Sequence, residues 1–76
     1  MTVLNPSVVN RIKSRKGIRC RTRLALNFGV GEQSISNWLN GEHADIRLTT
    51  PDALHVISEE MGIPHSQLLT VVKATA

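Results

Sequence analysis

The stretch GVGEQSISNWLNG, residues 29–41, contains the local signals that decide the fold of this chain. Two glycines flank Val30, and Gly29 is placed to take a left-handed conformation at the end of a preceding helix, which a residue with a Cβ atom would resist. Apolar residues then recur at helical spacing over residues 32–40, and Gly41 follows them. The stretch therefore predicts a short helix that begins directly after a glycine corner.

A second short helix is predicted immediately before this corner, over about residues 21–28. Ala25 provides the small side chain that two helices need where they cross closely, and Gly29 follows it by four residues. Ile35 comes ten residues after Ala25 and provides a buried contact for the second helix. Together these three features predict a helix-turn-helix over about residues 21–40.

The remaining apolar residues also recur at helical spacing, and no stretch keeps the two-residue alternation of a half-buried strand. Capping residues and glycine stops predict three further helices, between Asn5 and Gly17, between Thr50 and Gly62, and from Pro64 or His65 through Val72. A length of 76 residues is that of one domain. We therefore expect a single all-α domain of five helices over residues 1–76.

Positive charge is concentrated in the first third of the chain. Residues 1–23 carry seven arginine and lysine residues and no acid, whereas residues 24–76 carry two of these cations and six acids. A basic block beside a mildly acidic remainder favours a polyanion as the partner. The alternative interpretation is a solvated helix face that only aids solubility.

The composition argues against several other classes of protein. No apolar run approaches the ~20 residues of a membrane span, and residues 1–17 are too basic for a signal peptide. A single cysteine, Cys20, forms no intrachain disulfide and fits a reducing cytoplasm. We expect no enzyme activity, cofactor or small-molecule substrate, because no nucleophile–base pair, carboxylate dyad or dinucleotide-binding loop is present. We also expect no metal site, because no paired ligand spacing is found at His43, His55 or His65.

Two blocks of the chain carry a resemblance to a known family. They are RLALNFGVGEQSISNWLNG, residues 23–41, and TPDALHVISEEMGIPHSQLL, residues 50–69. The first resembles the leucine-alanine helix, glycine and recognition helix of Cro and lambda-repressor-like regulators, and the second resembles their last two helices. The resemblance covers about residues 20–69 and implies a five-helix domain that binds double-stranded DNA.

The resemblance implies that the beginning of the helix predicted over residues 32–40 enters the major groove of DNA. The candidate base-reading residues are Glu32, Gln33, Ser34 and Asn37. Gln33 can bind N6 and N7 of adenine bidentately, which gives about 1–3 kcal/mol of discrimination, and Glu32 can accept from N4 of cytosine. The alternative is that these residues are only the polar face of an amphipathic helix.

The same resemblance implies contacts with DNA phosphates, which fix the position of the protein on the duplex but do not read the base sequence. The candidates are Arg19, Arg21, Arg23, Asn40 and Arg47. Arg21 stands where family members usually have glutamine. Arg47 belongs to a stretch after Gly41 that is longer than is typical, and this stretch either contacts the DNA backbone or is a longer surface loop. Cations of the first helix are expected to attract DNA at long range.

Trp38 is expected to pack on the body of the domain, because stacked duplex DNA offers no free base face. A homodimer is expected because one recognition helix reads only a few base pairs, and its interface is predicted at Leu68, Val71 and Val72 of the last helix. The sequence thus favours a cytoplasmic transcriptional regulator, of the phage repressor kind, that binds an inverted repeat. The alternative is a protein-interaction module, such as an antitoxin that binds a toxin.

Overall fold

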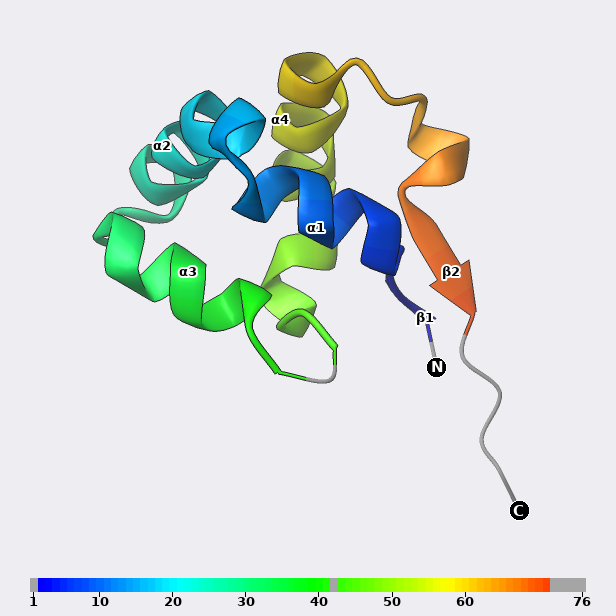
Figure 1. The fold of residues 1–76 in the computed structure, drawn as a ribbon, viewed down its shortest axis with the longest axis horizontal. Helices are drawn as coiled ribbons and strands as arrows, with labels where there is room; N and C mark the ends of the chain where they lie inside the picture. Colours follow the sequence, from blue (N-terminus) through cyan, green and yellow to red (C-terminus); the bar gives the residue numbers. More distant parts are fainter. Residues whose placement is uncertain (1, 42, 72–76) are drawn as a thin grey trace.

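Four α-helices and one two-stranded antiparallel sheet make up the described part of the chain, residues 2–41 and 43–71, in a computed structural model (Figure 1). The helices are α1 (Pro6–Lys13), α2 (Ile18–Phe28), α3 (Glu32–Leu39) and α4 (Pro51–Met61). The strands are β1 (Thr2–Leu4) and β2 (Leu69–Val71), and the three 3-10 turns are η1 (Arg15–Gly17), η2 (Ile46–Thr49) and η3 (His65–Gln67). The chain is therefore mostly helical, as predicted, with a small sheet that the sequence analysis did not predict.

Two of the helices begin at the prolines that the sequence marks. The side chain of Asn5 accepts a hydrogen bond from the backbone N–H of Ser7 at 3.1 Å, and Pro6 occupies the first position of α1. Thr50 precedes α4 and Pro51 begins it, but the Thr50 hydroxyl donates to the carbonyl of Arg47 instead of capping the helix. Proline therefore fixes the start of both helices, and a side-chain cap supports only α1.

The first two helices meet at different boundaries from those that the sequence predicted. α1 ends at Lys13, and the turn η1 leads directly into α2, which begins at Ile18. Gly17 lies so close to the carbonyl of Ile12 that any Cβ atom at this position would collide with it. The helix predicted up to Gly17 is therefore shorter, and α2 begins three residues earlier than predicted.

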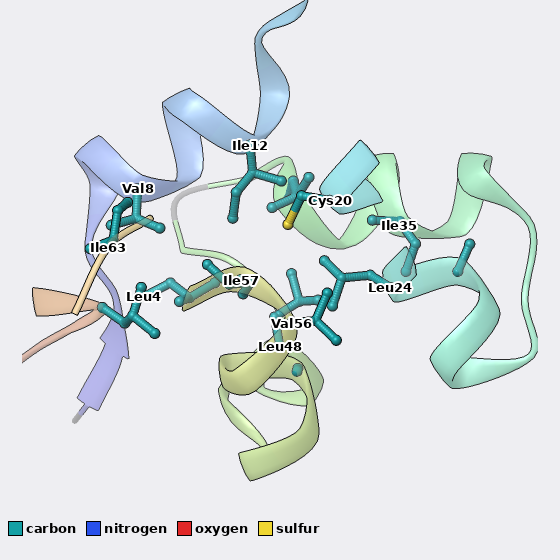
Figure 2. Close-up of a cluster of buried hydrophobic side chains, with 14 residues drawn as sticks. Leu4, Val8, Ile12, Cys20, Leu24, Ile35, Leu48, Val56, Ile57 and Ile63 are labelled. Atoms are coloured by element: carbon teal, nitrogen blue, oxygen red, sulfur yellow. The ribbon is translucent and has the colours of Figure 1, made fainter. Parts of the chain in front are cut away.

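The core is formed by apolar side chains from every α-helix, from β1 and from the η2 turn (Figure 2). Leu24 of α2, Ile35 of α3 and Ile57 of α4 are completely buried in it. The buried residues of this cluster are Leu4, Val8, Ile12, Cys20, Leu24, Ala25, Ile35, Leu39, Leu48, Ala53, Val56, Ile57, Ile63 and Leu68. Leu48 comes from a stretch for which the sequence indicated only a loop, so η2 is part of the packed domain.

The prediction of a fifth helix over about residues 64–72 is wrong for the described residues. The chain forms the η3 turn and then β2, which pairs with β1 so that Leu4 lies opposite Leu69 and Thr2 lies opposite Val71. The N–H of Asn5 also donates to the carbonyl of Leu68 at 2.8 Å. Pairing with a distant strand, which also suits β-branched residues, thus overrides the local helical spacing.

The loss of this helix changes the predicted dimer interface. Leu68 is completely buried in the core of its own chain, so its side chain is not available to a second copy. Val71 is 69% exposed at the end of β2. Val72 lies outside the described residues. Of the three predicted interface residues, Val71 is the one whose described side chain is open to a partner.

Candidate functional site

The corner between α2 and α3 consists of residues 29–31. Gly29 has φ 67° and ψ 34°, the left-handed conformation that the sequence predicted for it. The N–H of Val30 donates to the carbonyl of Ala25 at 3.0 Å, and the N–H of Gly29 donates to that of Leu26 at 3.3 Å. Val30 is half-buried and packs against the core. These contacts end α2 and fix the direction in which α3 begins.

One face of α3 is anchored in the core and the opposite face points outward. Ile35 is completely buried and Leu39 nearly so, and Figure 2 shows Ile35 among side chains of the neighbouring elements. With 3.6 residues per turn, Gln33 and Asn37 lie on the opposite face, and both are exposed. The Nε2 atom of Gln33 donates to Oδ1 of Asn37 at 3.2 Å. Two linked amides therefore form the centre of the outer face, which we call the amide strip.

Asn40 extends this outer face at the end of α3. Its backbone N–H donates to the carbonyls of Ser36 and Asn37, and its side chain is exposed. Ser34, the fourth predicted base-reading residue, is half-buried to one side of the amide strip. Of the four predicted base-reading residues, two therefore form the strip. The other two, Ser34 and Glu32, lie beside it.

Glu32 lies on the flank of α3 that faces α2. The hydroxyl of Thr22 lies 2.6 Å from Oε1 of Glu32 and 3.0 Å from the carbonyl of Ile18. This contact joins the middle of α2 to the first turn of α3. The carboxylate of Glu32 is therefore engaged with the protein at the edge of the outer face.

Trp38 lies on the opposite flank, where it is half-buried against the core. Its ring meets that of Phe28 edge-on, with centroids 5.1 Å apart and planes at 89°. The guanidinium carbon of Arg47 lies over the indole at 4.9 Å from its centroid. The expected packing of Trp38 on the domain is therefore found, and its contact with Arg47 is one that sequence reasoning missed. The nine-residue separation gave no periodic signal for it.

Arg21 is directed into the protein rather than outward. Its Nη1 atom donates to the carbonyl of Ile12 and, at 2.9 Å, to that of Ser14, and the side chain is half-buried. Carbonyls at the end of a helix lack partners within it, so a guanidinium here stabilises the end of α1. The candidate phosphate contact is therefore bound to the chain's own backbone.

Arg23 is also engaged, on the side of α2 that faces α4. Its Nη1 atom lies 3.1 Å from Oε1 of Glu59 and 3.0 Å from Oε1 of Glu60. The hydrogen bond with Glu60, together with Glu59, raises the pKa of Arg23. Its positive charge is offset by two carboxylates, so this ion-pair cluster joins α2 to α4.

A different set of cations is exposed. Arg19, in the first turn of α2, belongs to this set together with four residues of α1 and η1, and none of them forms an ion pair with a residue of the described ranges. The four are Arg11, Lys13, Arg15 and Lys16. Arg19 lies one helical turn before Thr22, hence toward the flank of α3 that holds Glu32. Lys16 lies instead beside Glu60 and Met61, at the end of α4.

The other polar chemistry of the chain is limited in the part that the structure describes. Cys20 is completely buried, and this burial raises the pKa of its thiol from 9.0 to about 11, so the sulfur is protonated near neutral pH. No group of metal-binding side chains lies together among residues 2–41 and 43–71. Within the same ranges, no helix has the length and apolar character to cross a membrane.

Comparison with protein-family models, curated proteins and solved structures finds no match to this chain.

The double contact of Arg21 with the end of α1 predicts a structural role. We expect Arg21→Met to lower the free energy of unfolding by about 1.5–3 kcal/mol, because it removes a charged hydrogen-bond donor from backbone carbonyls. Arg19→Met is the matched control on the same helix, and we expect it to change stability by less than about 0.5 kcal/mol. Urea denaturation measures both. Equal effects of the two substitutions would contradict the structural role.

Proposed function

We propose that this protein is a sequence-specific double-stranded DNA-binding regulator of the Cro and lambda-repressor-like kind, acting in the cytoplasm as a homodimeric repressor of the phage type. The observation that carries the proposal is the amide strip, in which exposed Gln33 and Asn37 are presented on a short helix anchored by its opposite face. Among the described residues, this strip combines outward amide groups with a rigid support and nearby free cations.

The dimensions of α3 suit the major groove. An α-helix with its side chains has a diameter of about 10–12 Å, which fits the groove width of about 12 Å, and α3 has only eight residues, so it is short enough to lie within the groove. Bases are read by side chains on the outer face, and the strip offers amides, which pair with adenine through one donor and one acceptor. One N–H of Gln33 is bonded to Asn37, so its carbonyl oxygen and its second N–H remain for adenine N6 and N7.

Arg19 and Arg47 lie on two sides of the amide strip. Arg19 lies toward the flank of Glu32, and Arg47 lies on the flank of Trp38. Phosphates border the groove on both sides, so cations on both flanks can fix the position of α3. We therefore assign phosphate contacts to Arg19 and Arg47, and we assign Arg21 and Arg23 to the support of the fold.

The proposed DNA recognition is tested with duplexes selected from a random pool. We expect log affinity to fall linearly with log salt, and Arg19→Gln to reduce the slope by about 0.9 while weakening all sequences alike. Gln33→Ala removes a bidentate contact, so the preference at one base pair falls by about 1–3 kcal/mol. Asn10→Ala, on α1, is the matched control with unchanged preference. A protein that selects no duplex and binds without salt dependence would contradict the proposal.

The proposed homodimer has its support at the opposite end of the molecule, where β1 and β2 lie away from α2 and α3 (Figure 1). Val71 is exposed at the end of β2, so two copies joined there would carry their α3 helices on the outside. A two-fold pair of this kind reads an inverted repeat with half-sites about one helical turn apart.

We expect sedimentation to show a concentration-dependent equilibrium between monomer and dimer that Val71→Asp shifts to monomer, because the substitution places a charge in an apolar contact. Thr70→Asp, on the opposite face of β2, separates damage to the sheet from loss of the interface, since only Val71→Asp is expected to remove the dimer. A protein that stays monomeric at all concentrations and on a palindromic duplex would contradict the dimer.

A second candidate function, a protein-interaction module such as an antitoxin, is favoured by one observation. Ile18 and Leu26 lie on the same side of α2, eight residues apart, and are 51% and 77% exposed. Apolar side chains of this kind suit a protein partner better than a phosphate backbone. Loss of partner binding in Leu26→Ser, with DNA binding unchanged, would assign this face to a protein.

A further inference from the structure

The contact between Trp38 and Arg47 is part of a closed set of interactions that joins η2 to the end of α3. The N–H of Asp45 donates to the carbonyl of Trp38 at 2.8 Å. The carboxylate of Asp45 accepts the backbone N–H of Arg47 at 2.9 Å and lies 3.9 Å from its Nε atom. The guanidinium of Arg47 then returns to the indole of Trp38. Both the backbone and the side chain of Arg47 are thus fixed relative to α3.

The base of this arrangement is rigid. Trp38 is held edge-on against Phe28, the last residue of α2, and packs against the core on its inner side. Leu48, the residue after Arg47, is completely buried and anchors η2. The indole and the turn therefore share one support, so the position of Arg47 depends on the fold rather than on a free loop.

The contact with the indole leaves the binding groups of Arg47 accessible. A guanidinium is planar, and its N–H groups point outward in that plane, so a ring that covers one face does not block them. The side chain of Arg47 is 60% exposed. Asp45 approaches it on the Nε side, which leaves the terminal nitrogens for a bidentate contact with two oxygens of a phosphate.

The position of Arg47 relative to the amide strip indicates which DNA strand it can contact. Trp38 follows Asn37 directly, and on α3 it lies on the flank opposite Glu32. Arg19 lies toward the Glu32 flank. A helix that lies in the major groove has one phosphate backbone on each side. Arg47, on the Trp38 flank, therefore faces the DNA strand that Arg19 does not face.

We propose that Trp38 is a positioning residue for DNA binding, and that its indole holds the Arg47 guanidinium in the orientation that binds a phosphate of this second strand. The proposal rests on the proposed function, because it names how one part of the same site holds the DNA. It assigns η2 and the residues around it to the DNA interface rather than to a surface loop without function.

The test is a double-mutant cycle on the selected duplex, measured over a range of salt concentrations. We expect Arg47→Gln to lower the slope of log affinity against log salt by about 0.9 and to leave base preference unchanged. Trp38→Leu weakens binding by about two- to fivefold, and this loss disappears in the Arg47→Gln background. Trp38→Phe, which keeps an aromatic face, restores most of the affinity.

Two controls separate a role of Trp38 through Arg47 from a general effect on stability, and this inference from the proposed function. In the Arg19→Gln background we expect the full loss from Trp38→Leu, because Arg19 contacts the DNA independently. A loss from Trp38→Leu that persists unchanged in Arg47→Gln would overturn the proposal, because Trp38 would then act only through stability. An unchanged salt slope in Arg47→Gln, with Gln33→Ala still relaxing base preference, would overturn this inference and leave the proposed function intact. Failure of every variant and of the parent protein to bind duplex DNA would overturn both.

Discussion

The burial of Ile35 and Leu39 against the rest of the domain is the interaction on which the proposed site depends. α3 has only eight residues, and an isolated helix of that length is not stable in water. Its existence and its rotation about its own axis are therefore set by these two anchors and by the left-handed corner at Gly29. Once the anchors are buried, helical geometry directs Gln33 and Asn37 outward. The amides face solvent because the opposite face is held.

The arginines of the chain divide into two groups with different physical roles. Arg21 stabilises the carbonyl end of α1, and Arg23 forms ion pairs with Glu59 and Glu60 across α2 and α4. Arg19 remains exposed at the start of α2, and Arg47 is held on an aromatic ring. The excess of positive charge in the first 23 residues therefore overstates the charge available to a polyanion, because part of it is used to join helices.

The sequence predicted the local features of this fold well, because they depend on neighbouring residues. The corner at Gly29 and the extent of α3 to within one residue follow from glycine, proline and apolar spacing. The pairing of residues 2–4 with residues 69–71 and the cation–π contact of Arg47 with Trp38 were missed, because both join segments without a periodic signal. The apolar residues before and within β2 follow helical spacing, and pairing with the distant strand β1 overrides it. The roles of Arg21 and Arg23 also depended on tertiary contacts.

The central claim is that the side-chain amides of α3 contact base edges, and NMR titration of the ¹⁵N-labelled protein with its selected duplex tests it most directly. The account predicts that the side-chain NH2 resonances of Gln33 and Asn37 shift strongly on binding. Asn10 and Asn27, exposed on α1 and α2, are internal controls whose NH2 signals should stay close to their free positions. Shifts confined to Asn10 or Asn27, with Gln33 and Asn37 unchanged at saturation, would contradict the account.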